Sequence, residues 1–381
     1  MNKSARAFMA LEWLCVFVFL VPDPVGASEE RDEIVVGFRE TITSSILDET
    51  RTLEIYLPDN FADSNEKYPV LIVLDGGWYF RYVISIVDMM SPNYMPRMIV
   101  VGLPNTDRRR DLDPSASSGP AEVGGADTFL RFLSEELIPH LESKYRAQQY
   151  RVVTGHSLAG YFTIYSLLKT PLLFDAFIAS SPSLRTPERL ELLLGELGKA
   201  EADARAGRYF FFSAGGNEPE ELHENHRAFG RELKKKSNGT TIRYEIFADE
   251  GHVPTRAFYT GIRGLFASWI PSPEFFRIGD VASMKRHYRA LTETYGFNVL
   301  PPAPIINSAG RRMLREGDVE GAAEVYEYFV FVYPRSVDAY LALAEVRVQM
   351  SQPDAAVANI KRALELEPGN QRAKEMLNGL L

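Results

Sequence analysis

The sequence predicts an α/β domain followed by a small all-α module. From Ile34 to about Trp269, apolar runs of strand length alternate with segments of helical periodicity, which is typical of an α/β sheet. After Pro271 the strand-like runs stop, prolines punctuate a connecting region, and small residues then recur at a fixed period. At 381 residues the chain is long enough for one large domain and a smaller one.

Seven stretches of the first region have the composition of strands, and each ends at a turn. Two of them are near-continuous apolar runs, as expected for central strands buried on both faces. In chain order the predicted strands are "TRTLEIYLP", "YPVLIVLDG", "RMIVVGLP", "YRVVTG", "FDAFIASSPS", "RYFFFSAGG" and "IRYEIFADEG". Helical spacing of apolar residues predicts helices in "ADTFLRFLSEELIPHLESKY", "YFTIYSLLKTP" and "TRAFYTGIRGLFASWI".

The N-terminus has the pattern of a secretory signal peptide. Lys3 and Arg6 precede an apolar run, and small residues end it at Val25-Gly26-Ala27. We therefore expect an exported, periplasmic or secreted protein with no stable membrane span after cleavage. The single cysteine, Cys15, lies in this segment, so the mature chain has neither a disulfide nor a thiolate nucleophile. A net charge of −9 argues against nucleic acid as a partner.

The C-terminal region carries a 34-residue repeat. Small residues at helix crossings and a closing proline at this period are typical of tetratricopeptide repeats. Six positions of the first unit, Gly310, Leu314, Gly317, Ala322, Tyr326 and Pro334, recur as Ala344, Val348, Ser351, Ala356, Ile360 and Pro368. One amphipathic helix, Val281–Tyr295, is predicted before them. Because two repeats bury little apolar surface, we expect them to pack on that helix and on the preceding α/β domain, or on a protein partner.

Ser157 is the candidate nucleophile. It lies in "RVVTGHSLAGYF", between a predicted strand and a predicted helix, which is the context of the G-x-S-x-G nucleophile elbow. Ala159 stands where the second glycine of that motif belongs. The turn forces the serine into a strained backbone conformation that needs small neighbours, and alanine adds only one methyl group.

A serine nucleophile needs a base, and His252 is the candidate. It follows the last predicted strand in "FADEGHVPTRAFY", where a base would overhang the sheet edge. The acid that orients it should follow the preceding strand. Glu218, the first carboxylate after the Gly215-Gly216 turn, is the leading candidate. The alternatives are Glu220, Glu221 and Asp249.

Further groups complete the candidate site. The backbone N–H groups of Leu158 and Gly77 are expected to form the oxyanion hole. Trp78 and Tyr79 are predicted to line a substrate pocket. Arg108 and Arg109 follow a strand at the same sheet edge and are either solvated or bind an acidic or catecholate substrate. No metal site is expected, because His223 and His226 have no third ligand at a fitting spacing.

Together these blocks resemble the putative-esterase family of α/β-hydrolases, in its siderophore (enterochelin) esterase-like branch. The resemblance covers residues 34–272 and rests on "PVLIVLDGGWYF", "VVGLPNTDRRRDLDPS", "VTGHSLAGYF", "ASSPSL", "SAGGNE" and "GHVPTRAFYTGIRGLF". It implies a doubly wound, mainly parallel sheet with helices on both faces. It also implies Ser157 as nucleophile, His252 as base, an acid at Glu218 and oxyanion amides at Gly77 and Leu158.

The sequence therefore predicts an exported serine esterase that hydrolyses small-molecule carboxylic esters, siderophore-like or aryl, through an acyl-enzyme, without a cofactor. One alternative is an acyltransferase on the same scaffold. Another is an inert hydrolase-fold protein that recruits partners through its repeats. The predicted organisation is a signal peptide at 1–27, an esterase domain at 28–272, a linker with one helix at 273–304 and repeats at 305–381.

Overall fold

The computed structural model describes residues 34–59, 61–62, 66–114, 125–199, 202–253 and 256–380. Contacts divide the chain into Met1–Val35 and Val36–Leu381, and all the helices and strands of the described residues belong to the second unit. The predicted signal peptide, residues 1–27, lies outside the described residues. Within the described ranges, no helix combines the length and the apolar character needed to cross a membrane.

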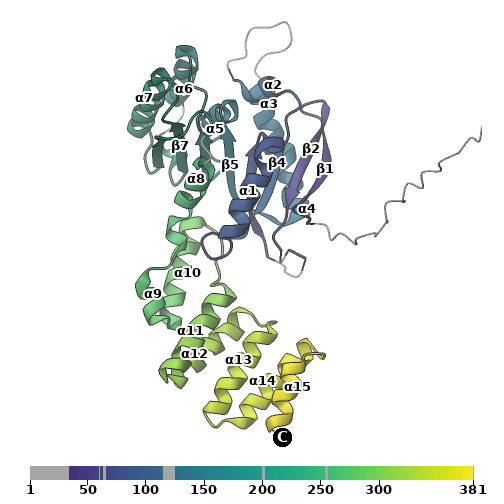
Figure 1. The fold of residues 1–381 in the computed structure, drawn as a ribbon. Helices are drawn as coiled ribbons and strands as arrows, with labels where there is room; N and C mark the ends of the chain where they lie inside the picture. Colours follow the sequence, from purple (N-terminus) through teal and green to yellow (C-terminus); the bar gives the residue numbers. More distant parts are fainter. Residues whose placement is uncertain are drawn as a thin grey trace, which may run out of the picture. The chain divides into compact units, whose positions relative to one another are not determined.

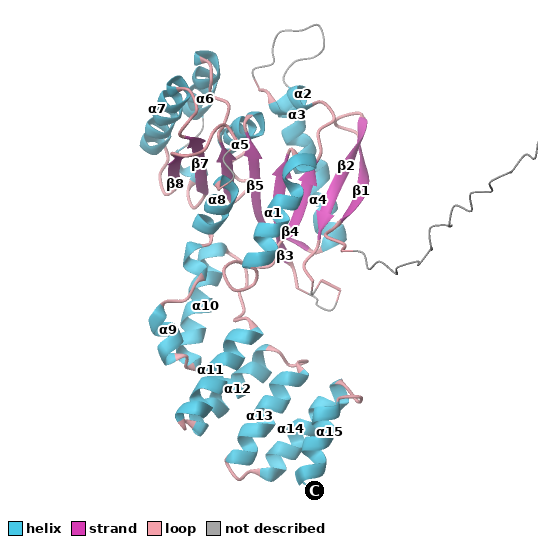
Figure 2. Cartoon of the chain, in the orientation of Figure 1, coloured by secondary structure: helices cyan, strands magenta, loops and turns pink. Residues whose placement is uncertain are grey.

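Eight strands form one sheet in the order β1-β2-β4-β3-β5-β6-β7-β8 (Figures 1 and 2). The pairs β1–β2 and β2–β4 are antiparallel, and all other neighbours are parallel, so the predicted mainly parallel sheet is confirmed. The strands are β1 Phe38–Ser44, β2 Glu49–Tyr56, β3 Tyr68–Leu74, β4 Ile99–Leu103, β5 Ala147–His156, β6 Ala176–Ser180, β7 Tyr209–Gly215 and β8 Thr241–Phe247.

The one strand that sequence analysis did not identify is β1. Its residues, FRETITS, are mostly polar and mostly exposed, and it pairs only with β2 at the sheet edge. An edge strand needs only one covered face, so its apolar signal is weak. The central strand β3, by contrast, is buried along its whole length, as its apolar run predicts.

Helices cover both faces of the sheet (Figure 2). Leu71 and Val73 of β3 share an apolar cluster with α1 and α8, whereas Ile72 and Leu74 face a second cluster with α4, α5, α6 and α7. The helices of this part are α1 Gly76–Met90, α2 Arg108–Leu112, α3 Gly125–Arg131, a π-helical turn Phe132–Leu137, α4 Ile138–Tyr145, α5 Leu158–Lys169, α6 Pro187–Lys199, α7 Glu220–Lys236 and α8 Ala257–Leu265, with 3₁₀ turns at Ala202–Arg205 and Ala267–Trp269.

The C-terminal part is helical throughout. Its helices are α9 Pro273–Ile278, α10 Val281–Tyr295, α11 Ala303–Glu316, α12 Val319–Val332, α13 Val337–Gln349, α14 Pro353–Leu366 and α15 Gln371–Leu380. The predicted helix Val281–Tyr295 is confirmed, and the region predicted as a linker with one helix also contains α9. Helices α11, α13 and α15 begin at residues 303, 337 and 371, so each begins 34 residues after the last.

The helix crossings explain the small residues of the repeat. A side-chain carbon at Gly310 would lie 2.5 Å from Cζ of Tyr326, so only glycine lets α11 and α12 approach this closely. Ala344 is fully buried in a cluster with Ile360 of α14. The period in the sequence is therefore the spacing of successive helix pairs.

Candidate active site

Ser157 occupies a sharp turn between β5 and α5. Its φ and ψ of 59° and −115° lie in a region that residues other than glycine rarely adopt. A side-chain carbon at Gly155 would lie 2.5 Å from the backbone oxygen and 2.8 Å from Cβ of Ala159, so glycine at 155 lets the end of β5 approach the first turn of α5 this closely. Ala159 is fully buried. The departure from the usual second glycine therefore fits the turn.

The structure brings Ser157, His252 and Glu218 into one hydrogen-bonded line. Oγ of Ser157 lies 2.9 Å from Nε2 of His252, and Nδ1 of the same ring lies 2.6 Å from Oε1 of Glu218. The three residues follow β5, β8 and β7, whose carboxyl ends meet at one edge of the sheet. With a carboxylate accepting from Nδ1–H, Nε2 is left free to accept the serine proton.

Glu218 is buried and satisfied on both oxygens. Its Oε2 accepts hydrogen bonds of 2.8 Å from Oγ of Ser181 and from the backbone N–H of Gly215. Burial by itself raises the pKa of Glu218, but the hydrogen bonds from His252, Gly215 and Ser181 outweigh it and hold the pKa below its ordinary value. The carboxylate therefore stays ionised beside the imidazole.

The alternative carboxylates point elsewhere. Glu220 pairs with Arg227 on α7, Asp249 pairs with Arg256, and Glu221 is exposed in the first turn of α7. Of the four carboxylates considered, Glu218 is the one that hydrogen-bonds to His252.

Sequence analysis missed a second chain of hydrogen bonds, through His156. The ring accepts at Nδ1 from the hydroxyl of Tyr79, at 2.9 Å, and donates from Nε2 to the backbone carbonyl of His252. Burial lowers the pKa of His156, so the ring is neutral. A neutral ring can accept at Nδ1 while it donates from Nε2. A histidine next to the serine was the only signal in the sequence.

The expected oxyanion donors lie in the first turns of two helices. Gly77 is the second residue of α1 and Leu158 is the first residue of α5. N–H groups in a first turn have no carbonyl partner within their own helix, so both are available to a ligand. Gly76 allows the close approach of this turn to β4, since a side-chain carbon there would lie 2.5 Å from the backbone nitrogen of Leu103.

Arg108 forms an ion pair that supports the turn before α1, so it is not a solvated side chain. It holds the buried carboxylate of Asp75 through two hydrogen bonds of 2.7 and 2.8 Å, and Asn105 donates to the same carboxylate. Asp75 adopts the left-handed conformation, with φ of 55°, directly before the first turn of α1. The neighbouring Arg109 is exposed on α2.

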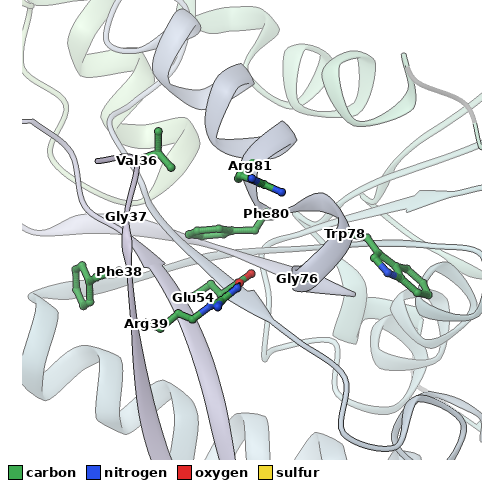
Figure 3. A pocket seen from close by; sticks show the side chains of 10 residues that line it. Val36, Gly37, Phe38, Arg39, Glu54, Gly76, Trp78, Phe80 and Arg81 are labelled. Carbon is green, nitrogen blue, oxygen red and sulfur yellow. Dashed lines mark hydrogen bonds and ion pairs between the residues drawn. The ribbon is translucent and has the colours of Figure 1, made fainter. Parts of the chain in front are cut away.

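The expected pocket residues differ in burial. Trp78 is 67 % exposed, with the guanidinium of Arg108 5.4 Å from its ring centroid. Tyr79 is half-buried between His156 and Phe258. A cavity of about 460 Å³ opens beside Gly77, between the start of β1 and the start of α1 (Figure 3). It is lined by Val36, Gly37, Phe38, Arg39, Glu54, Gly76, Gly77, Trp78, Phe80 and Arg81.

Among the described residues, no cluster of three or more His, Cys, Asp or Glu side chains could hold a metal ion. His223 and His226 of α7 are both buried, and His226 donates to the backbone carbonyl of Pro182.

Comparison with known families gives a direct assignment. The sequence profile described as "Putative esterase" matches residues 44–238, slightly more than half of the chain. The chain belongs to the putative-esterase family. Its mainly parallel α/β sheet agrees with the α/β-hydrolase fold that the motifs resemble.

Two relatives of this esterase-family chain are named as siderophore esterases. The ferri-bacillibactin esterase BesA of Bacillus subtilis is 31 % identical over 159 residues, which are 36 % of this chain and 55 % of that protein. The siderophore triacetylfusarinine C esterase of Aspergillus fumigatus is 36 % identical over 81 residues, which are 20 % of this chain and 28 % of that protein. The chain thus spans about half, or less, of the relatives it matches.

Solved structures extend the likeness. An IroE-like serine hydrolase from Shewanella oneidensis has a TM-score of 0.65 and 27 % identity, and the match covers 76 % of this chain and 97 % of that one. An uncharacterised protein from Capnocytophaga ochracea has a TM-score of 0.62 and 17 % identity over 90 % of this chain and 99 % of that one. The second match shows fold alone.

Proposed function

We propose that this protein is a serine esterase that hydrolyses carboxylic esters through an acyl-enzyme. The observation that carries the proposal is the line of hydrogen bonds from Ser157 through His252 to Glu218. A nucleophile within reach of a base, itself oriented by a carboxylate, is the arrangement that activates a serine hydroxyl.

The proposed reaction has two halves. His252 Nε2 takes the proton of Ser157 as Oγ attacks the ester carbonyl, and the N–H groups of Gly77 and Leu158 bind the resulting oxyanion. The imidazolium then protonates the leaving alkoxide, which departs and leaves the acyl group on Oγ. In the second half His252 deprotonates a water molecule, which attacks the acyl carbonyl. The bond from that carbon to Oγ then breaks, the imidazolium returns its proton to Ser157, and the acid is released. Glu218 stays ionised and stabilises the imidazolium in both halves.

We propose siderophore-like or aryl esters as the substrate class. The names of the relatives support this class, since two of them are siderophore esterases. The exposed Trp78 ring, in the first turn of α1 next to Gly77, suits a substrate with an aromatic group.

The test is a panel of p-nitrophenyl, aryl and catecholate esters. Ser157→Ala should lower kcat by about 10⁶-fold, the scale on which loss of a triad nucleophile acts. Ser143→Ala, an exposed serine on α4, is the matched control and should leave kcat unchanged. A serine-directed fluorophosphonate should label wild type at Ser157 and not the alanine variant. Equal turnover by wild type and Ser157→Ala would contradict the mechanism, and failure of the whole panel on labelled wild type would contradict only the substrate class.

We also propose that α11–α15 are tetratricopeptide-like repeats that bind a protein partner. The 34-residue interval between successive helix pairs supports this proposal. A partner captured by the full chain should be lost when residues after Arg335 are removed. Capture that survives this removal would contradict the proposal.

We further propose export through a cleaved signal peptide at residues 1–27, on the charge and hydropathy pattern of that segment. N-terminal sequencing of exported protein should begin near Ser28. A sequence that begins at Met1 would contradict cleavage.

A further inference from the structure

A second concave site lies between α7 and the edge strand β8, away from the candidate triad. It is a groove of about 680 Å³, a volume in the range of small-molecule sites. Its lining residues are Phe212, His226, Arg227, Gly230, Arg231, Lys234, Ser237, Thr240, Ile242 and Tyr244. Ser157 follows β5, three strands from β8, so about 14 Å of sheet separates the two sites.

The floor of the groove is flat and apolar. Tyr244 and Ile242 of β8 are partly exposed there, and the Tyr244 ring stacks on the buried ring of Phe212 with centroids 4.5 Å apart. Gly230 keeps this floor open, because a side-chain carbon at that position would lie 3.0 Å from Cζ of Phe212. A planar hydrocarbon surface fits such a floor better than a branched one.

The rim is positively charged. Arg227, Arg231 and Lys234 of α7 line the groove, and no residue of the described lining is acidic. Arg227 pairs with Glu220 outside the lining, so Arg231 and Lys234 supply the charge of the rim. This concentration of positive charge is local, since the whole chain has a net charge of −9. The rim therefore attracts an anion, and Arg231 and Lys234 are exposed and within the groove to meet it.

Two buried polar atoms of the lining residues, the hydroxyl of Tyr244 and Nδ1 of His226, have no hydrogen-bond partner among the described residues. Burial raises the pKa of Tyr244 to about 12, so the hydroxyl keeps its proton and remains a donor.

A second copy of the chain does not fit this groove as well as a small anion does. A two-fold contact through β8 places the same surface opposite itself and brings Arg231 and Lys234 of each copy together. Like charges that face each other across an interface are unfavourable.

We propose that the groove between α7 and β8 binds a small aromatic carboxylate, with its ring on Tyr244 and Ile242 and its carboxylate at Arg231 and Lys234. This inference does not depend on esterase activity, because it concerns a different surface and a binding step alone.

Calorimetric titration of the full chain with 2-naphthoate tests it. We expect saturable binding, and binding at least about tenfold weaker for acetate, which lacks the ring, and for 2-naphthylmethanol, which lacks the charge. Arg231→Gln combined with Lys234→Gln should weaken 2-naphthoate binding by about tenfold or more, because two charge-assisted contacts are lost.

Lys235→Gln is the matched control. It removes one charge from the same helix, but Lys235 pairs with Glu232 and does not line the groove, so affinity should stay within about twofold. Circular dichroism should show that every variant is folded. Absence of 2-naphthoate binding, or equal affinity in wild type and the Arg231→Gln, Lys234→Gln variant, would overturn the proposal. The second outcome would also place any observed binding elsewhere, including the candidate active site.

Discussion

The two oxygens of Glu218 have different neighbours. Oε1 faces His252, while Oε2 is held by Ser181 and by the backbone of Gly215. Because Oε2 is fixed from two sides, the carboxylate cannot rotate away from the imidazole without breaking two buried hydrogen bonds. Ser181 adopts a positive φ of 40°, a conformation that serine rarely takes and that helps to place its hydroxyl against the carboxylate.

Glu218→Gln should lower kcat by about 10²–10⁴-fold with little change in fold, since the amide keeps the shape but cannot stabilise the imidazolium. Steady-state kinetics on a soluble aryl ester measures the effect. Glu221→Gln, an exposed carboxylate three residues along the chain, is the control and should be silent. A silent Glu218→Gln together with a damaging Glu221→Gln would show that the acid is misassigned.

His226 makes stability depend on pH. Burial lowers the pKa of His226 to about 4 from an ordinary 6.5, and the charges of His223 and His252 act in the same direction. The Pro182 carbonyl and the charge of Glu218 raise this pKa, but by less. The folded state resists protonation of this ring. The contribution of neutral His226 to the unfolding free energy is therefore complete above about pH 6.5, and it is lost as the pH falls toward about 4. The loss amounts to about 3 kcal/mol of unfolding free energy.

His226→Gln keeps a donor for the Pro182 carbonyl but cannot titrate. Urea unfolding of wild type and variant, at neutral pH and near pH 4, should show a smaller acid-induced loss of stability in the variant. Parallel losses in the two proteins would mean that His226 titrates as an ordinary histidine.

At the scale of elements, His156 joins three segments that the candidate site needs. The hydroxyl of Tyr79 comes from α1, the ring of His156 ends β5, and the carbonyl of His252 belongs to the loop after β8. This chain of bonds fixes the backbone of the base loop relative to the elbow. We interpret His156 as a positioning residue, because it contacts the backbone of His252 and acts through it.

His156→Ala should therefore lower kcat by about 10–100-fold, the cost of a misplaced catalytic group, and slow fluorophosphonate labelling of Ser157 in parallel. Tyr79→Phe breaks only the outer bond and should have a smaller effect in the same direction. Tyr94→Phe, on an exposed tyrosine beyond α1, is the control. If His156→Ala lowers the melting temperature while active-site labelling of the folded protein keeps its wild-type rate, the residue is structural only.

At the scale of the whole molecule, the core of the esterase domain continues into α10. Met284, Tyr288, Leu291 and Tyr295 of α10 belong to the same apolar cluster as Leu71 and Val73 of the central strand. The hydroxyl of Tyr295 donates to the carbonyl of Leu265, and the ring packs against Tyr150, Phe266 and Trp269. Residues 273–304 therefore contribute to the core.

Two truncations separate this core role from the repeats. A stop after Ser272 removes α10 and exposes several aromatic rings, each worth about 1.5–3 kcal/mol of burial, so we expect an insoluble or strongly destabilised protein. A stop after Arg335 keeps α10, α11 and α12, and should leave kcat/KM on small soluble esters unchanged. Thermal unfolding and p-nitrophenyl ester kinetics measure both. Full stability of the chain that ends at Ser272 would show that the core does not need α10.

Local sequence signals were sufficient for much of the fold. Seven of the eight strands, the helix Val281–Tyr295 and the 34-residue period could be recognised because each depends on apolar spacing within a short window. The exposed strand β1 lacks that spacing, and the packing of α10 on the sheet involves residues far apart in the chain. Neither the strand β1 nor this packing could be predicted from a short stretch of sequence.

The candidate site shows the same division. Ser157 and His252 could be named from the sequence, because a nucleophile elbow and a loop after the last strand each have a local pattern. The choice among Glu218, Glu220, Glu221 and Asp249 had no such pattern, since four carboxylates lie near the ends of two strands. It depends on side-chain direction, which the Ser181 hydroxyl and the Gly215 amide set for Glu218. The link through Tyr79 and His156 likewise joins residues 77 positions apart. Such contacts arise only when the strands are assembled side by side, so tertiary structure alone decides them.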